Sequence, residues 1–205
     1  RLQWAVRGML ITDKKIRKLV KERNLIAPFS EELLQSESYD VTIGNKIVLF
    51  RKDEVRCLDI AKQNDIDSIY QEVDISENGY VISPSEYILV QINEKINLPD
   101  DISAHIRPKT RYTRLGLVVS AQHCNSSYAG TLRIGLFNAT GYPIRIRRGY
   151  SIAQLVFEEL NEVASDEKLY RIKESAHYQN ENGEFRGAKF DDNFLDKVMG
   201  EILNK

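Results

Sequence analysis

Four cationic side chains lie close together in the segment IRPKTRYTRLGL, which spans residues 106–117. Arg107, Lys109, Arg111 and Arg114 fall within a stretch of eight residues, and the segment contains no aspartate or glutamate. Guanidinium and ammonium groups bind phosphate and carboxylate oxygens through charge-assisted hydrogen bonds. The segment therefore indicates an anion-binding site.

The charge of the whole chain favours a local anion site over a general polyanion-binding surface. The 205 residues contain 29 Lys and Arg against 30 Asp and Glu. This near-neutral balance argues against general affinity for nucleic acid or anionic lipid. Acidic residues are absent between Ile102 and Phe157, where eight Lys and Arg occur. Strands use few carboxylates, but 56 residues without one acid favour an anion site over that explanation.

Several common catalytic motifs are missing from the sequence. Zinc-dependent nucleobase deaminases need an H-x-E motif followed by C-x-x-C; neither motif occurs, so we expect no protein-bound zinc. The G-x-x-x-x-G-K-[ST] loop, the G-x-G-x-x-G turn and the G-x-S-x-G elbow are also missing. His105, His123 and His177 occur in unrelated contexts, which favours structural or surface imidazoles. Phosphate binding must therefore rest on side chains of strands and loops.

The elements that position these residues begin with a helix and a strand pair. Asp13 is the expected N-cap of an amphipathic helix, because apolar residues follow it at helical spacing. The alternating pattern of SYDVTIGNKIVLF (38–50) predicts a strand, a turn at Gly44-Asn45 and a second strand. Residues 51–78 are charged and lack clear periodicity, so we expect a long loop there.

From Gly79 onward, the sequence consists of short β-like runs separated by turn residues. The runs are YVISP, EYILVQIN, ISAHIRP, LGLVVSAQ, TLRIGLFNA, YPIRIRR and SIAQLVFEEL. Many short strands with regularly spaced turns predict an all-β barrel or sandwich.

The region after Glu159 is predicted to be a tail followed by a helix. HYQNENGEFRGAKF has two glycines and few apolar residues, which is typical of a mobile tail or a lid. The last 16 residues predict a helix that docks on the barrel or on a neighbouring subunit. Its apolar face consists of Phe194, Leu195, Val198, Met199, Ile202 and Leu203. We divide the chain into residues 1–8 (an expression remnant or an extension), a domain at 9–160, and a tail with a helix at 161–205.

Cysteine content and hydropathy bear on the cellular location. Cys57 and Cys124 are far apart and imply no disulfide framework, which favours a reducing compartment. No apolar run approaches the ~18 residues that cross a membrane, and residues 1–8 do not resemble a signal peptide. We therefore expect a cytoplasmic protein that does not enter membranes.

Three segments, KTRYTRLGL, YAGTLRIGLFN and RRGYSIAQLVFEEL, occur in an order that resembles the dCTP deaminase/dUTPase family. MLITDKKIRKLV is similar to that family's opening helix, and SYDVTIGNKIVLF to its first nucleotide motif, centred on Asp40. The resemblance covers most of the chain. It implies a mainly β, distorted jelly-roll (dUTPase-like) barrel with a short N-terminal helix and a C-terminal helix. It also implies a homotrimer with active sites at subunit interfaces, a deoxypyrimidine triphosphate (dCTP or dUTP) as ligand, and a tail that closes over it.

The resemblance assigns roles to individual residues. In the family, the segment matching KTRYTRLGL lies along the triphosphate, with Lys109 where the family has Arg and Thr110 where it has Ser. Arg114 matches a family Arg, whereas Arg111 falls on an uncharged position. The other implied nucleotide-binding residues are Tyr128 of the hairpin, Gln154, the tail tyrosine Tyr170, and His177 in place of a tail lysine.

The sequence departs from the family at both catalytic carboxylates. Gly135 stands where the deaminase branch has a Glu that relays protons, and Asn125 stands where the dUTPase branch has an Asp that activates water. Neither residue can hold a proton as a general base near neutral pH. A carboxylate from elsewhere could replace them, with Asp40, Glu181 and Glu184 as candidates. Asp40 is also interpreted as structural, bonding its own turn. Mg²⁺ could accompany the nucleotide, held mainly by the phosphates.

Three functional hypotheses remain open. The first is an enzyme that deaminates dCTP to dUTP, cleaves dUTP to dUMP and diphosphate, or does both. The second is a catalytically impaired member of the family that binds nucleotide as a regulatory protein, which the departures at Asn125 and Gly135 favour. The third is a surface for single-stranded nucleic acid, with Tyr112 and Tyr128 as stacking groups; few aromatics accompany the cations, so nucleic acid is the least favoured partner.

Overall fold

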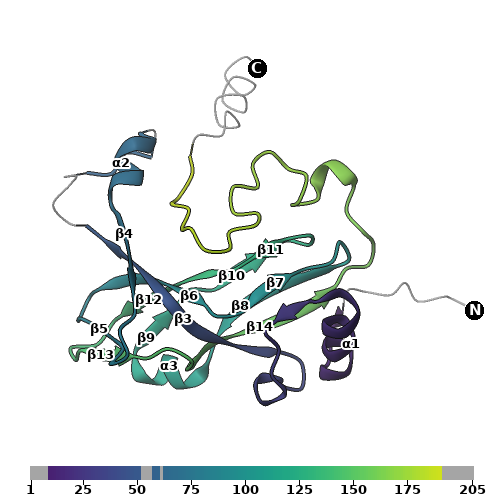
Figure 1. The fold of residues 1–205 in the computed structure, drawn as a ribbon, viewed down its shortest axis with the longest axis horizontal. Helices are drawn as coiled ribbons and strands as arrows, with labels where there is room; N and C mark the ends of the chain where they lie inside the picture. The colour runs from purple at the N-terminus through teal and green to yellow at the C-terminus, as the bar shows by residue number, and fades with distance from the viewer. Residues whose placement is uncertain (1–8, 52–56, 61, 191–205) are drawn as a thin grey trace, which may run out of the picture.

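The protein folds around one curled antiparallel sheet, which confirms the predicted mainly β barrel (Figure 1). The computed structural model describes residues 9–51, 57–60 and 62–190. The main sheet has the strand order β10-β8-β14-β3-β6-β12-β9, with β1 paired to β14 and β4 paired to β3. Two smaller sheets, β11-β7-β2 and β13-β5, complete the barrel.

The described residues form fourteen strands, three α-helices and two short 3₁₀ turns, η1 and η2. In chain order they are β1 (Met9–Leu10), α1 (Asp13–Arg23), β2 (Ile26–Ala27), η1 (Glu31–Leu33), β3 (Tyr39–Phe50), α2 (Gln63–Ser68), β4 (Tyr70–Asp74), β5 (Tyr80–Ile82), β6 (Tyr87–Ile92), β7 (Lys95–Asn97), β8 (Ile102–Pro108), α3 (Thr110–Leu115), β9 (Leu117–Val119), β10 (Gln122–Cys124), β11 (Ala129–Gly130), β12 (Arg133–Asn138), β13 (Ile144–Ile146), β14 (Ser151–Glu159) and η2 (Asp166–Lys168).

The core is built from the inward-facing aliphatic side chains of these strands. Along β14, Leu155 and Phe157 are fully buried, whereas Val156 and Glu158 between and beyond them are half-buried. Such alternation follows from the two-residue period of a strand, which turns successive side chains to opposite faces. The apolar face that excludes water thereby fixes the register of the strands.

Two local predictions are wrong. Gly44-Asn45 forms no turn, because β3 runs through it as one strand with a register shift between Ile43 and Ile47. A β-carbon at Gly44 would lie 2.9 Å from the Gln91 carbonyl oxygen, so the glycine permits close approach of β6. Asp13 is the first residue of α1 instead of its N-cap, and its carboxylate pairs with Arg17.

The segment 51–78 is also more regular than predicted. In its described part, α2 is followed by β4, which pairs with β3 from Lys46↔Asp74 to Phe50↔Tyr70. The charged sequence hid this strand because β4 lies at the edge of the sheet and buries little of its surface.

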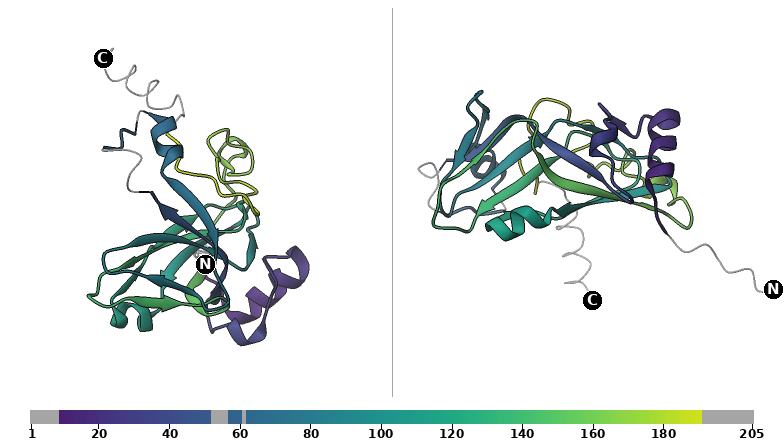
Figure 2. Two further views of the ribbon diagram at one scale, coloured as in Figure 1. Left: turned by 60° about the vertical axis from the view of Figure 1, so that its left-hand side comes forward. Right: turned by 90° about the horizontal axis from the view of Figure 1, so that it is seen from below.

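The tail folds back over one side of the barrel, where Figures 1 and 2 show it above β10 and β11. Asn180 donates its backbone N–H to the Ala129 carbonyl (2.7 Å), and Thr131 donates to the Glu181 carbonyl (2.7 Å). This part of the predicted tail is therefore packed on the barrel, and its closure over a ligand stays a prediction. The predicted terminal helix and residues 1–8 lie outside the described residues, and the boundary at residue 160 stays a prediction.

None of the helices in the described ranges has the length and apolar character needed to cross a lipid bilayer.

Candidate functional site

The cationic segment of the sequence lies at the end of β8 and on α3. Lys109 is the N-cap residue of α3, directly after β8, and its ammonium group pairs with the Asp40 carboxylate; both side chains are nearly buried. Asp40 thus binds a cation at the start of α3, which corrects its interpretation as a residue that bonds its own turn. Thr110 and Arg114 lie on α3 and are exposed. Arg114 makes no hydrogen bond or ion pair with any residue in the described ranges and can meet a ligand directly.

Gln154 lies beside this segment on β14. It is directly opposite Asp40 on β3 and Arg107 on β8, and its amide oxygen is 3.5 Å from the Ser38 hydroxyl. The structure therefore brings together Gln154, Lys109 and Asp40, as the motifs imply. We call these three residues, together with Thr110 and Arg114 on α3, the cationic cluster.

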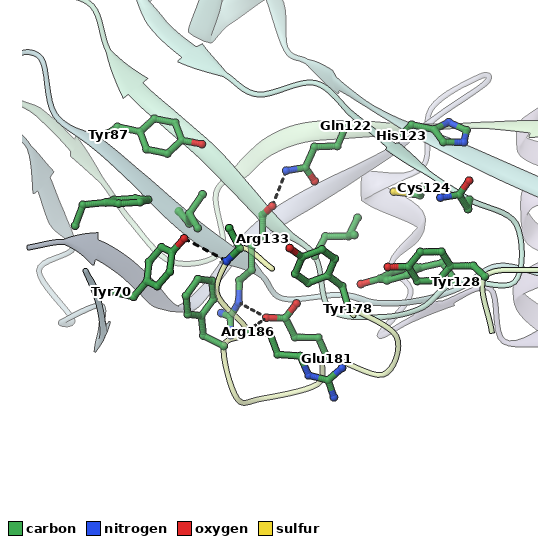
Figure 3. A pocket seen from close by; sticks show the side chains of 17 residues that line it. Tyr70, Tyr87, Gln122, His123, Cys124, Tyr128, Arg133, Tyr178, Glu181 and Arg186 are labelled. Atoms are coloured by element: carbon green, nitrogen blue, oxygen red, sulfur yellow. Dashed lines mark hydrogen bonds and ion pairs between the residues drawn. The ribbon is translucent and has the colours of Figure 1, made fainter. Parts of the chain in front are cut away.

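A cavity of about 650 Å³ lies at a different place, between the hairpin that precedes β11 and the folded tail (Figure 3). Its size falls in the range typical of small-molecule sites. Aromatic rings make much of its wall, with a few polar groups among them. The lining residues are Phe50, Tyr70, Tyr87, Leu89, Gln122, His123, Cys124, Asn125, Tyr128, Leu132, Arg133, Tyr170, Tyr178, Glu181, Phe185, Arg186 and Ala188.

The hairpin contributes Asn125 and Tyr128 to this cavity. Tyr128 donates its backbone N–H to the Asn125 carbonyl (3.2 Å), which closes a turn with Ser127 at φ 63°. Asn125 is exposed, whereas Tyr128 is buried and packs edge-on against Tyr170 of the tail, with ring centroids 5.8 Å apart. Burial raises the pKa of the Tyr128 hydroxyl, so the ring stays neutral. The predicted residues Asn125, Tyr128 and Tyr170 therefore do meet in one pocket.

Gly135 lies on β12, where a side chain would point toward Tyr87. A β-carbon at this position would collide with the Tyr87 hydroxyl, which covers the glycine from the neighbouring strand β6. Burial raises the pKa of this tyrosine as well. The space that a larger residue would need at position 135 is therefore filled by an aromatic ring.

An arginine that the sequence analysis did not single out dominates the electrostatics of the cavity. Arg133 is 9% exposed, and its Nη2 donates to Glu72 Oε2 (3.0 Å). Its Nε lies 3.7 Å from Oε1 of Glu181, a tail residue that is 5% exposed. The sequence did contain a signal for this residue: a charge inside the apolar run TLRIGLF needs a buried partner.

Burial raises the pKa of the Glu181 carboxyl, and the nearby Arg133 and Arg186 lower it only in part. The backbone N–H of Arg186 donates to Glu181 Oε1 (2.8 Å) and fixes the side chain. Glu184, the other tail carboxylate considered above, is exposed and lies outside the wall of this cavity. Among the candidates for a relocated carboxylate, Glu181 is the one that reaches the cavity.

The cationic cluster and the cavity do not share lining residues. Figures 1 and 2 show α3 on the side of the barrel opposite the folded tail. Lys109, Thr110, Arg114 and Gln154 are therefore not brought together with Asn125 and Tyr128 within one chain.

Of the three histidines, His123 lines the edge of the cavity, and His105 and His177 do not line it. The rings of His105 and His123 pack across β8 and β10 with centroids 4.8 Å apart, as surface residues of the sheet. His177 lies in the tail, where its carbonyl accepts a hydrogen bond from Arg186 (2.6 Å). Within the described ranges no cluster of three or more His, Cys, Asp or Glu could hold a metal ion.

The two cysteines are expected to differ in reactivity. Burial raises the pKa of the Cys124 thiol to about 12, whereas Cys57 is exposed. Since the thiolate is the nucleophile, iodoacetamide at pH 7.5 should modify Cys57 and leave Cys124 intact in the folded protein. Mass spectrometry of tryptic peptides checks this, with the urea-unfolded protein as the control in which both react. Rapid labelling of Cys124 in the folded protein would contradict the packing of β10.

Comparison with known proteins identifies the family to which this fold belongs. Residues 10–160 match the dCTP deaminase-like family. The chain is 34% identical over 187 residues to a dCTP deaminase, dUMP-forming, of Nanoarchaeum equitans, covering 83% of this chain and 93% of that protein. It is 31% identical to the Persephonella marina protein of the same name, covering 92% and 99%.

A solved structure agrees with these relatives. The crystal structure of 2'-deoxycytidine 5'-triphosphate deaminase from Agrobacterium tumefaciens matches with a TM-score of 0.61 and 25% sequence identity. The match covers 75% of this chain and 49% of that chain, so this chain spans about half the length of that protein. The chain belongs to the dCTP deaminase-like family.

Proposed function

We propose that this protein acts in deoxypyrimidine nucleotide metabolism by binding a deoxypyrimidine triphosphate and deaminating dCTP. The observation that carries the proposal is the 650 Å³ cavity beside the hairpin, which holds a buried guanidinium and a buried carboxylate on its wall. Aromatic faces with a few fixed polar groups suit a nucleobase. The family membership and the names of the relatives support the same substrate class.

In this proposal, the base end of the nucleotide enters the cavity beside Asn125, Tyr128 and Tyr170, and the phosphates meet the cationic cluster. Because the cavity and α3 lie on different sides of one chain, the two parts are supplied by neighbouring protomers, as a homotrimer would allow. His177 would approach the terminal phosphate from the tail. Mg²⁺ would arrive with the triphosphate, and we place the reaction in the cytoplasm, with no nucleic acid or membrane as partner.

Purified protein incubated with dCTP or dUTP and Mg²⁺ tests the proposal. Anion-exchange chromatography separates dUTP, dUMP and diphosphate, and calorimetric titration measures binding of the same nucleotides. We expect ammonia release from dCTP. The proposed function is wrong if neither nucleotide binds. Binding of an oligonucleotide with a steep salt dependence, in place of nucleotide binding, would point to the single-strand surface.

Replacing Arg114 by alanine is expected to weaken triphosphate binding by about 2 kcal/mol, or roughly 30-fold, because a phosphate oxygen loses a charge-assisted hydrogen bond. Calorimetric titration of dCTP measures the change. Arg111→Ala is the matched control, since Arg111 is an exposed cation on the same helix. Equal dissociation constants for Arg114→Ala and the wild-type protein would remove Arg114 from the site.

The second candidate function is a nucleotide-binding regulatory protein without turnover. Two observations favour it: the neutral residues Asn125 and Gly135 at the family's carboxylate positions, and the Tyr87 ring that fills the space next to Gly135. Tight binding of dCTP or dUTP without any product would establish this function.

A further inference from the structure

Hydrolytic deamination of an aminopyrimidine requires a group that takes a proton from water and returns it to the departing amine. Glu181 is the one carboxylate on the wall of the cavity among the described residues. Burial raises the pKa of the Cys124 thiol and of four lining tyrosines, so these groups keep their protons near neutral pH: Tyr87, Tyr128, Tyr170 and Tyr178. His123 also lines the cavity, but its ring packs against His105 of the neighbouring strand β8.

The backbone holds Glu181 firmly in place. Its carbonyl accepts from Thr131 (2.7 Å), and its neighbour Asn180 donates to Ala129 of β11. Its Oε1 accepts from the Arg186 N–H (2.8 Å). Within the described part of the chain no hydrogen bond engages Oε2, so this oxygen can meet a water or a substrate. Hydrogen bonds with the main chain of the barrel and of Arg186 therefore fix this tail residue in the wall of the cavity.

Arg133 provides the second half of the arrangement. Its Nη2 donates to Glu72, but its Nε and Nη1 are buried and find no hydrogen-bond partner among the residues that the structure describes. At 3.7 Å, the contact with Glu181 is an ion pair too long for a hydrogen bond. Figure 3 shows Arg133 and Glu181 facing each other on the cavity wall, with Tyr178 beside them. Buried donors without acceptors are costly, and the ring nitrogen and carbonyl oxygen of a cytosine could satisfy them.

Arg133, and with it the paired Glu181, lies on the same side of β12 as Gly135. Arg133 and Gly135 are two residues apart on β12, so their side-chain directions are on the same face of the strand. A carboxylate paired with Arg133 therefore lies on the same face of β12 as a side chain at position 135 would. Tyr87 closes the space directly over Gly135, and the carboxylate enters from the tail side instead.

We infer that Glu181 is the proton-transfer residue of this site and that Arg133 positions it; this rests on the proposed dCTP deamination. The Glu181 carboxylate accepts one proton from water as the water oxygen bonds to C4 of the cytosine, and this proton passes to N3. The second proton of the water then moves through Glu181 to the amino group. The C4–N bond breaks, ammonia leaves, and C4 becomes a carbonyl, so atoms balance and no electron is transferred.

The test compares Glu181→Gln with Glu184→Gln, an exposed carboxylate three residues along the same tail. We expect Glu181→Gln to lower kcat for dCTP by 10²–10⁴-fold while its calorimetric dissociation constant for dCTP stays within about threefold. Glu184→Gln should match the wild-type protein in both. If Glu181→Gln keeps kcat within tenfold of a wild-type protein that does turn over dCTP, the inference is wrong and the proposed function stands. If the wild-type protein binds dCTP without turnover, both the deamination and the inference fail.

The pH dependence of the wild-type protein adds a readout that needs no variant. Since Glu181 must be ionised to accept a proton, kcat should fall on acidification through its raised pKa, which lies above the ordinary 4.5. A kcat that stays constant from pH 8 to pH 5 would overturn the assignment. The charged and titratable groups that face Glu181 are Arg133 on β12, Glu72 on β4 through Arg133, Lys46 on β3 through Glu72, Arg186 in the tail, and Tyr128, Tyr170 and Tyr178.

Discussion

Replacing Arg133 by methionine is expected to lower the free energy of unfolding by about 3–5 kcal/mol at pH 8. The substitution keeps most of the side-chain volume but removes the cation that lies between Glu72 and Glu181. Lys46 still pairs with Glu72 (2.6 Å), whereas the one donor left to the Glu181 carboxylate in the described part of the chain is the Arg186 backbone N–H. Urea denaturation followed by tyrosine fluorescence or circular dichroism measures the loss.

The loss should shrink as the pH falls. Burial raises the pKa of Glu181 in the folded protein above its unfolded value, so the folded state binds the proton more tightly. A group of this kind stabilises the fold below its unfolded pKa, and that contribution disappears as the pH rises through the folded pKa. Without Arg133 the ionised carboxylate is more costly still, and protonation relieves more of the cost. The difference between variant and wild type should therefore be smaller at pH 5 than at pH 8.

Two controls isolate the buried charge. Arg145→Met removes an exposed arginine that makes one hydrogen bond to the Asn78 carbonyl, and it should change stability by less than about 1 kcal/mol. Adding Glu181→Gln to Arg133→Met should recover part of the lost stability, because the two residues share one interaction. An equal loss at pH 5 and pH 8 would show that Glu181 is not the group left uncompensated.

The sequence predicted the barrel because the alternation of apolar and polar residues along a strand is a local pattern. It can be recognised without knowing which strands pair. The apolar runs after Gly79 and the order of the family motifs identified the fold, and the structure confirms both. Asp13 was misplaced because Thr12, one residue earlier, takes the N-cap position of α1. The Gly44-Asn45 pair was misplaced because strand pairing overrides its local preference for a turn. A single strand through Gly44 forms because β6 and β14 both pair with β3, which a turn there would disrupt.

The site could be predicted only in part. The residues at Lys109, Gln154, Tyr128 and Tyr170 were found through motifs, and the structure places them in two separate groups. Arg133 was missed because its partner Glu181 lies 48 positions further along the chain, beyond the reach of any periodicity. Glu181 was one of three carboxylates that the sequence could not distinguish; burial in the cavity separates it from the exposed Glu184.

Gly135→Glu is expected to destabilise the protein by about 1–3 kcal/mol, because the new side chain must displace the Tyr87 ring. Tyr87 is 43% exposed and its strand neighbour Phe50 packs against it with ring centroids 5.5 Å apart, so rotating the ring outward loses this contact. In a Tyr87→Ala background the same substitution should cost less than about 1 kcal/mol. Thermal and urea denaturation of the two single variants and the double variant give the coupling energy. Purely additive effects would mean that Tyr87 does not occupy the space at position 135.

The double variant Gly135→Glu/Tyr87→Ala also separates the two candidate functions. If Glu181 transfers the proton, adding Glu181→Gln to this double variant should leave dCTP turnover well above that of Glu181→Gln alone, because position 135 and Arg133 share one face of β12. If the protein only binds nucleotide, the wild type should show no turnover of dCTP and the double variant should show some. The reason is that a placed general base typically contributes 10²–10⁴-fold to the rate. Ammonia release from dCTP measures both cases, with Glu184→Gln in the same background as the control. Turnover that is the same in the wild type, in Glu181→Gln and in the double variant would place the proton-transfer group at neither position.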